Sequence, residues 1–279
     1  TRFRSLYTAG AYARFGNQRM QLMNLVARKQ VDGILLASVD YTRMDPFVEE
    51  ACSAGVPVVA LINDIYAPAI KAKVMVSFFE MGTLAGRYIL EHAAKRDLKI
   101  AVLPGPRNAG WAADSVAGML DAFRRRKAPH QRITVLEPLY GDTRRDVQRI
   151  RLDILSRPEN HGLDYIVGNA VAAVAAVDYL DRNREIHPKG QIVSTYITSR
   201  VYEQIQAGSI LAALSDQSIS QCRIALDMVV KILEGQAAGK DFPFRVSPII
   251  PLITRDNIGR FPYETLFGEK DFKPVFDEF

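Results

Sequence analysis

The fold is decided by the stretch Lys99-Ile-Ala-Val-Leu-Pro-Gly-Pro-Arg-Asn-Ala-Gly-Trp-Ala-Ala-Asp-Ser-Val-Ala-Gly-Met-Leu-Asp-Ala-Phe123. It begins as an apolar strand, passes through a turn rich in glycine and proline, and continues as an amphipathic helix. The chain's single tryptophan, Trp111, stands near the start of that helix. Because ligands bind beyond the carboxyl ends of strands in open parallel sheets, Trp111 is a candidate ligand contact. Burial in the core is the alternative for this side chain.

The same alternation of strand and helix runs along most of the chain. Short apolar runs predict strands at residues 3–8, 33–38, 56–62, 74–78, 99–103, 132–137, 164–168, 191–196 and 210–215. Helical patterns lie between most of them, at residues 18–29, 45–54, 79–95, 112–127, 142–156, 170–182, 200–207 and 218–233. This order predicts an α/β fold with parallel sheets flanked by helices. Nine strands are too many for one sheet of ordinary size, and we therefore expect two similar lobes.

Composition is that of a soluble globular protein, with 48% hydrophobic and 24% charged residues among 279 and a mean hydropathy of −0.04. The net charge of +5 is modest, and the tight basic run at residues 124–127 ends a predicted helix, where cations complement the helix dipole. We therefore expect no nucleic-acid partner. No apolar run approaches the roughly 20 residues of a membrane span, so no membrane insertion is expected.

Several local features add to this outline. Thr1 is not a translation start and no leader pattern follows it, so we expect a processed or truncated chain. Cys52 and Cys222 lie in helical patterns without a CxxC spacing, which favours buried thiols. The run at residues 246–254 holds two prolines and predicts an edge strand or an extended crossing segment. Residues 269–279 show no periodicity and are expected to form an extended arm.

The motifs of catalysis are missing from the sequence. It contains no P-loop, no GxGxxG after a strand, no GxSxG and no HExxH. The four histidines, at 92, 130, 161 and 187, have no ligand spacing and are expected at the surface, so no metal or cofactor is predicted. Carboxylates near strand ends, at 64, 80, 114 and 216, could act as acid and base, but no nucleophile accompanies them. We therefore predict no catalytic residues and a protein that is not an enzyme.

Aromatic and polar side chains gather instead at the ends of predicted strands. This mixture is suited to holding a small molecule by stacking and hydrogen bonds. Phe78 and Phe79 are expected in the core. The predicted ligand-binding residues are Tyr12, Asn63, Glu80, Trp111, Asn169, Tyr196 and Asp216.

Several segments resemble the type I periplasmic binding proteins of the ribose-binding and LacI-like class, and the likeness covers nearly the whole chain. They are Gln30-Val-Asp-Gly-Ile-Leu-Leu-Ala-Ser-Val-Asp40, Ala54-Gly-Val-Pro-Val-Val-Ala60, Glu80-Met-Gly-Thr-Leu-Ala-Gly86, Ile100-Ala-Val-Leu-Pro-Gly-Pro-Arg107 and Asp164-Tyr-Ile-Val-Gly-Asn-Ala-Val-Ala-Ala173. Ser194-Thr-Tyr-Ile-Thr198 and Leu214-Ser-Asp-Gln217 are similar to the members that serve trimethylamine N-oxide respiration.

The resemblance implies two Rossmann-like lobes that close on a ligand held in the cleft between them. One lobe would comprise residues 1–96 and 218–242, and the other residues 97–217 and 243–279. Three crossings would fall near residues 95–98, 215–218 and 241–248. Family members begin with one more βα unit before the turn seen here as Ala9-Gly10-Ala11-Tyr12, so the chain is expected to lack the first βα unit.

The resemblance also implies a ligand and a partner. Trimethylamine N-oxide has a methylated cationic nitrogen and an anionic oxygen, which call for an aromatic cage and a hydrogen-bond donor. Tyr12, Trp111 and Tyr196 could form that cage. Glu80 stands near where the family tends to carry a tryptophan, and an acidic residue there would favour a more fully cationic methylamine. The partner would be a membrane sensor histidine kinase, and the location the periplasm.

Two other functions stay open at this point. A solute-binding protein of an ABC importer would share the fold, with a pocket richer in Asp, Asn and Arg for a sugar or a similar solute. The effector domain of a transcription repressor would require a helix-turn-helix in the parent gene. The scarcity of arginine at strand ends argues weakly against a sugar.

Overall fold

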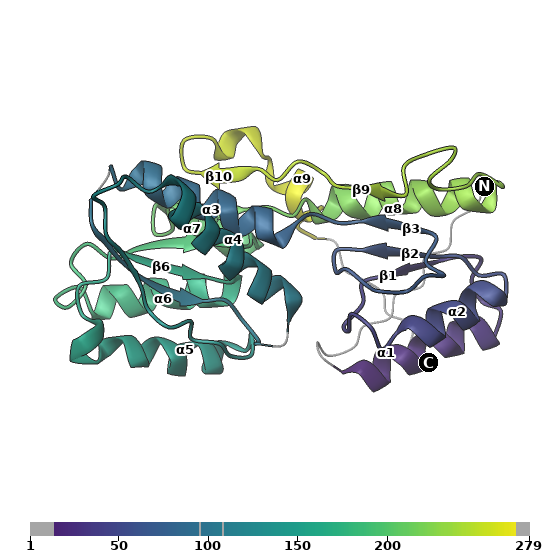
Figure 1. The fold of residues 1–279 in the computed structure, drawn as a ribbon, viewed down its shortest axis with the longest axis horizontal. Helices are drawn as coiled ribbons and strands as arrows, with labels where there is room; N and C mark the ends of the chain where they lie inside the picture. The colour runs from purple at the N-terminus through teal and green to yellow at the C-terminus, as the bar shows by residue number, and fades with distance from the viewer. Residues whose placement is uncertain (1–13, 95, 108, 272–279) are drawn as a thin grey trace. The chain divides into compact units, whose positions relative to one another are not determined.

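The computed structural model describes residues 14–94, 96–107 and 109–271. These residues form two compact units (Figure 1). The first unit contains residues 14–76, 217–249 and 268–271, and the second contains residues 77–216 and 250–267. Each unit has its own sheet, as the number of predicted strands indicated. The α/β class with sheets of mainly parallel strands is thus confirmed.

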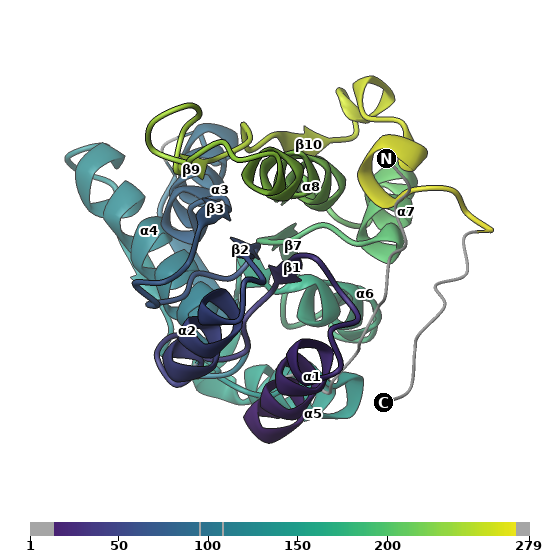
Figure 2. The same cartoon turned by 90° about the vertical axis from the view of Figure 1, so that its right-hand side faces the viewer.

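The first unit is built on a four-stranded parallel sheet with the order β1-β2-β3-β9. Its strands are β1 (Ile34–Leu36), β2 (Val58–Leu61), β3 (Ala72–Val74) and β9 (Arg245–Val246). Its helices are α1 (Phe15–Ala27), α2 (Asp45–Ser53) and α8 (Ser218–Leu233). Figures 1 and 2 both show α1 and α2 on one face of this sheet and α8 on the other.

Strand β2 shows why helices cover both faces of this sheet. Its four residues are all buried, and successive side chains point to opposite faces. Val58 and Ala60 pack in the cluster that holds α1 and α2, whereas Val59 and Leu61 pack with α8. A continuous apolar run is what a strand buried on both faces requires.

The second unit is built on a six-stranded sheet with the order β10-β8-β7-β6-β4-β5. Its strands are β4 (Leu98–Leu103), β5 (Ile133–Val135), β6 (Tyr165–Gly168), β7 (Gln191–Ser194), β8 (Ala212–Leu214) and the antiparallel edge strand β10 (Leu252–Thr254). Its helices are α3 (Phe78–His92), α4 (Gly110–Arg126), α5 (Arg145–Asp153), α6 (Ala170–Arg182), α7 (Ser199–Ala207) and α9 (Tyr263–Phe267). Short 3₁₀ helices lie at Ile154–Ser156, Pro158–Asn160 and Ile258–Arg260.

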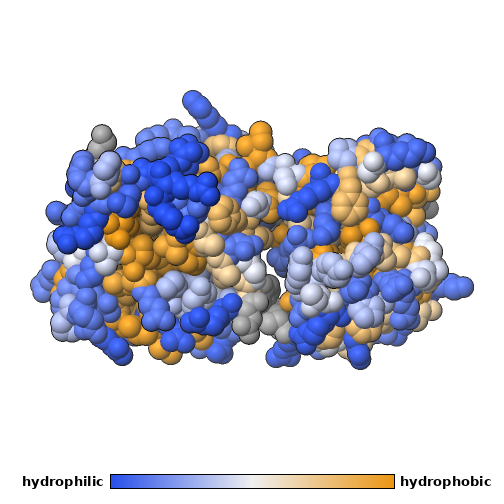
Figure 3. Space-filling view, in the orientation of Figure 1, coloured by the Kyte–Doolittle hydropathy of each residue, from blue (hydrophilic) through white to orange (hydrophobic). Residues whose placement is uncertain are grey.

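Helices α3 and α4 pack together with very close backbones. A Cβ built on Gly82 would lie 2.0 Å from the carbonyl oxygen of Ser115, and one on Gly118 would lie 1.9 Å from that of Phe79. Only glycine therefore fits at either position. Figure 3 shows strongly hydrophilic side chains gathered over this helix pair, whose basic end is Arg124–Arg126 in the last turn of α4.

The division into units differs from the one expected from the sequence. The expected first crossing lay near residues 95–98, but the structure divides the chain after Val76 and places α3 in the second unit with α4. The second crossing lies at 216–217, within the expected segment, the third lies after Ile249, and the chain returns to the first unit after Phe267. Residues 243–249 and 268–271 therefore belong to the first unit and not, as expected, to the second. The strand expected at 74–78 is β3, which instead spans Ala72–Val74. Ser77 cannot extend it because it caps α3, accepting a hydrogen bond from the Glu80 amide at 3.1 Å.

Two smaller expectations were wrong, namely that all four histidines lie at the surface and that both cysteines are buried. His187 is fully buried, and its Nε2 lies 2.9 Å from the Tyr179 hydroxyl. Cys222 is exposed and Cys52 is half-buried, so neither is a fully buried thiol. The prolines 248 and 251 lie between β9 and β10, and both strands occupy sheet edges as predicted. Residues 272–279 of the expected arm lie outside the described residues.

Candidate functional site

The candidate site lies along the carboxyl edge of the six-stranded sheet. Parallel pairing aligns Leu103, Gly168 and Ser194, which end β4, β6 and β7. The residues that follow these strands therefore emerge at one edge. Asn169 and Tyr196 follow two of them, Trp111 follows the turn after β4, and Asp216 follows β8. Four of the seven predicted ligand-binding residues thus belong to one edge of one unit.

Asn169 is committed to structural hydrogen bonds. It is 4% exposed and caps α6, with Oδ1 accepting from the amides of Val171 at 3.0 Å and Ala172 at 3.2 Å. Its Nδ2 donates to the Leu103 carbonyl at 3.1 Å. Its side chain therefore fixes the end of β4 against the start of α6, so its role at the edge is to position neighbouring residues.

Tyr196 and Asp216 form a polar pair at the edge. The Tyr196 hydroxyl donates to Asp216 Oδ2 at 3.4 Å, and Asp216 is 1% exposed. The tyrosine ring is half-buried against the core of the unit. Ser194 Oγ donates to the Tyr196 carbonyl at 2.6 Å, which fixes the backbone from which the ring projects. A carboxylate next to an aromatic ring is suited to a cationic nitrogen.

Trp111 lies in the first turn of α4 and is half-buried. Its ring packs against Gly105, where a Cβ would lie only 2.4 Å from the ring carbon Cη2. Gly105 also has φ of 120°, which disfavours any other residue. The Pro-Gly-Pro turn after β4 therefore makes room for the indole ring. The burial of this ring lies between the two alternatives considered from the sequence, exposure at a ligand site and burial in the core.

The remaining predicted residues do not join this edge as one cluster. Asn63 belongs to the first unit, where it follows β2 and its Nδ2 donates to the Ser38 carbonyl at 3.0 Å. Glu80 is an exposed residue in the first turn of α3. Tyr12 lies outside the described residues.

Two tyrosines that sequence reasoning missed stand at the corresponding edge of the first unit. Tyr41 follows β1 and Tyr66 follows β2, with exposed fractions of 55% and 56%. Their ring centroids are 6.5 Å apart at an interplanar angle of 46°, and the Tyr66 amide donates to the Tyr41 carbonyl at 2.6 Å. The rule that selected Tyr196, an aromatic residue shortly after a strand, would also have selected this pair.

Neither a metal site nor a membrane-spanning helix is found among the residues that the structure describes. No group of three or more His, Cys, Asp and Glu side chains there is arranged to hold a metal ion. Within the same residues, no helix has the length and apolarity needed to cross a bilayer.

The fold agrees with the comparison to known families. The model for the periplasmic binding protein domain matches residues 5–237, so the chain belongs to the periplasmic binding protein family. The chain is 30% identical over 270 residues to the periplasmic protein TorT of Escherichia coli K12, covering 96% of this chain and 73% of TorT.

Two solved structures show the same resemblance. An ABC transporter solute-binding protein from Bradyrhizobium sp. BTAi1, with bound Bis-Tris, has a TM-score of 0.81 and 34% identity, covering 98% of this chain and 79% of that one. TorT in complex with the TorS sensor domain in the presence of trimethylamine N-oxide has a TM-score of 0.78 and 25% identity, covering 96% and 87%.

Proposed function

We propose that this chain is a periplasmic ligand-sensing protein that binds trimethylamine N-oxide or a related methylamine and signals to a sensor histidine kinase of the TorS type. It acts by binding and not by catalysis. The observation that carries the proposal is the Tyr196–Asp216 pair on the same sheet edge as Trp111. The similarity to TorT across 96% of the chain supports it.

The chemistry of this edge suits a methylated nitrogen. Aromatic faces attract a cation, and the buried carboxylate of Asp216 adds a negative charge beside the Tyr196 ring. Bis-Tris, which the Bradyrhizobium protein binds, is likewise a tertiary amine.

The alternative is a solute-binding protein of an ABC importer, with a sugar or a similar solute as ligand. A specific observation favours it, because the Bradyrhizobium solute-binding protein is 34% identical to this chain. The two functions share the fold but differ in the ligand and in the membrane partner, so a ligand titration separates them.

Trp111 offers a direct test because no other tryptophan contributes to the fluorescence of the chain. Trimethylamine N-oxide, glycine betaine, choline and ribose are titrated in turn while tryptophan emission is recorded, and calorimetry measures the heat. We expect saturable binding of at least one methylamine with a change in Trp111 emission. Ribose binding without any response to the methylamines would reject the proposal in favour of the importer.

The kinase partnership is tested separately. The purified chain is mixed with the sensor domain of a TorS-type kinase, and complex formation is followed by analytical ultracentrifugation with and without the methylamine. A 1:1 or higher complex is expected. Methylamine binding with no complex under either condition would leave the ligand assignment standing and reject the kinase.

A further inference from the structure

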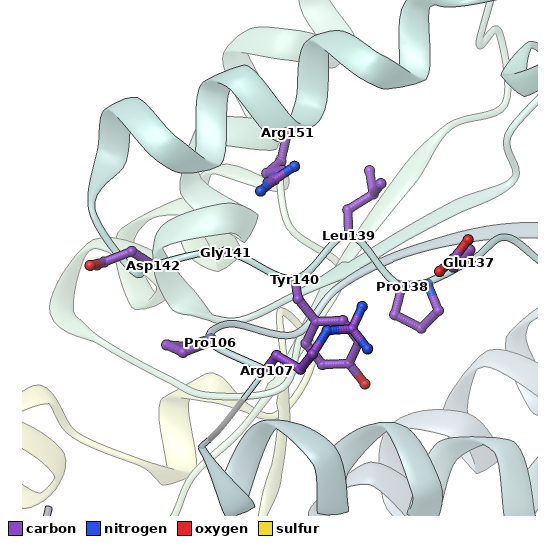
Figure 4. Close-up of a pocket in the computed structure, with 9 residues that line it drawn as sticks. All are labelled: Pro106, Arg107, Glu137, Pro138, Leu139, Tyr140, Gly141, Asp142 and Arg151. Carbon is purple, nitrogen blue, oxygen red and sulfur yellow. The ribbon is translucent and has the colours of Figure 1, made fainter. Parts of the chain in front are cut away.

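A cavity in the second unit has a different chemical character from the sheet edge that holds Trp111, Tyr196 and Asp216. It has a volume of about 590 Å³ and lies between the turn after β4 and the segment that follows β5 (Figure 4). This volume is within the range of small-molecule sites. None of its lining residues was selected from the sequence. They are Pro106, Arg107, Glu137, Pro138, Leu139, Tyr140, Gly141, Asp142 and Arg151.

Arg151 supplies a positioned guanidinium. It projects from α5 toward the middle of the cavity (Figure 4) and is half-buried. Its side chain lies against Gly141, where a Cβ would come within 3.3 Å of Arg151 Nε. Gln148, fully buried on the same helix, donates to the carbonyl of Asp142 at 2.5 Å and so fixes this segment. Among the described residues, no carboxylate lies within ion-pair distance of Arg151.

Arg107 supplies a second guanidinium on the opposite side of the cavity. Its Cζ lies 4.3 Å from the centre of the Tyr140 ring, and Figure 4 shows the two groups stacked. Such stacking holds the guanidinium plane while its N–H groups remain free to donate at the edge. The two arginines therefore reach the cavity from α5 and from the turn after β4.

The two carboxylates of the lining do not neutralise these arginines. Asp142 accepts a hydrogen bond from the Arg144 amide at 3.0 Å and lies 3.9 Å from the Arg144 side chain. Figure 4 shows its carboxylate turned away from Arg151, with Glu137 at the opposite end of the cavity. The middle of the cavity is therefore electropositive.

We propose that this cavity binds a small organic carboxylate. Paired guanidinium groups recognise a carboxylate through charge-assisted and bidentate hydrogen bonds. The remaining wall is apolar, formed by Pro106, Pro138, Leu139 and the Tyr140 ring, which favours an organic frame over a bare inorganic anion. The site uses no residue of the methylamine proposal, so it goes beyond that function.

Benzoate is the probe, and benzamide is its neutral counterpart of the same shape. Calorimetric titrations at low ionic strength are made without any methylamine, so the result is independent of the proposed main function. Benzoate is expected to bind at millimolar or lower concentration, benzamide not to bind, and added salt to weaken benzoate. Arg151→Gln is expected to reduce benzoate affinity by about tenfold or more, because it removes the charged fork.

Arg149→Gln is the matched control, since Arg149 lies on the same helix but faces Asp178 at 3.5 Å. Its affinity for benzoate should stay within about twofold of the parent. Should Arg151→Gln fail to fold in a thermal-denaturation check, Arg151→Lys replaces it and should bind more weakly than the parent, because lysine lacks the planar fork. No benzoate binding at millimolar concentration, equal binding of benzamide, or a folded Arg151 variant with parental affinity would each overturn the proposal.

Discussion

At the scale of single residues, the position of Trp111 depends on Gly105. The φ of 120° at Gly105 and the 2.4 Å distance from a built Cβ to the indole mean that a side chain here must displace the ring. The sequence showed the glycine and the tryptophan six residues apart in one turn, but not that the ring folds back over the turn. The position of the indole ring is determined by how it packs in the folded chain, and local sequence patterns do not encode that packing.

Gly105→Ala is expected to destabilise the chain by about 1–3 kcal/mol, from the unfavourable φ and the displaced ring. Chemical denaturation measures the loss, and the Trp111 emission maximum of the folded variant should shift. Gly110→Ala is the control, because a Cβ there meets nothing within 4 Å. Equal stability of the two variants would mean that the indole does not need this turn.

Trp111→Ala tests the binding role of the same ring. We expect methylamine affinity to fall at least about tenfold, since an aromatic cage loses one wall, with only a small loss of stability because the ring is half-buried. Calorimetry measures the affinity and thermal unfolding the stability. A large drop in melting temperature with unchanged affinity would assign the indole to the core instead.

At the scale of elements, α3 and α4 cross with their backbones in close contact at Gly82 and Gly118. Helical periodicity predicted both helices within a few residues of their bounds, because each has one apolar face. Their partnership was not predictable, since it rests on glycines that a pattern of apolar residues ignores. For that reason the sequence assigned α3 to the first lobe, although it packs on α4.

Gly118→Ala should therefore destabilise, by about 1–3 kcal/mol or more, because its Cβ would collide with the Phe79 carbonyl. In an exposed helix the same change would stabilise by about 1 kcal/mol. The control is Ala117→Gly, on the exposed face of α4, which should cost only about 1 kcal/mol. Urea denaturation measures the free energy of unfolding of both variants. A Gly118→Ala variant as stable as the parent would mean that the two helices do not cross this closely.

At the scale of the whole molecule, a buried histidine links stability to pH. Burial lowers the pKa of His187 below its usual 6.5, and the nearby His161 and Lys99 add to the effect, partly opposed by a backbone hydrogen bond at Leu155. At pH values below 6.5 but above the lowered pKa of His187, the folded chain therefore holds this histidine neutral while the unfolded chain protonates it. Neutral histidine suits the site, since its Nδ1 accepts from the Leu163 amide at 3.3 Å.

Stability should accordingly fall as pH drops below about 6.5, because the unfolded state then binds more protons. The contribution of His187 cannot exceed about 1.4 kcal/mol per pH unit, the value for one proton. Urea unfolding from pH 7.5 to 5 measures the slope, and His187→Gln should flatten it. If the His187→Gln variant keeps the parental dependence of stability on pH, another group is responsible for it.

The sequence predicted the class of fold and most strands well, and the site only in outline. Buried runs such as β2 and capped helices such as α6 carry strong local signals. The edge of the sheet was predictable because polar and aromatic residues follow strands. Whether Asn169 would face a ligand or cap a helix was not, because the same amide suits both tasks and only the fold chooses between them.

The chain order of the first unit has a consequence for its biosynthesis. Val59, Leu61 and Val74 are covered by α8, which is translated only after residue 216, when nearly all of the second unit has already been made. Strands β1, β2 and β3 are therefore made before the helix that covers one of their faces, so the first unit is expected to complete its fold only after α8 and β9 have been translated.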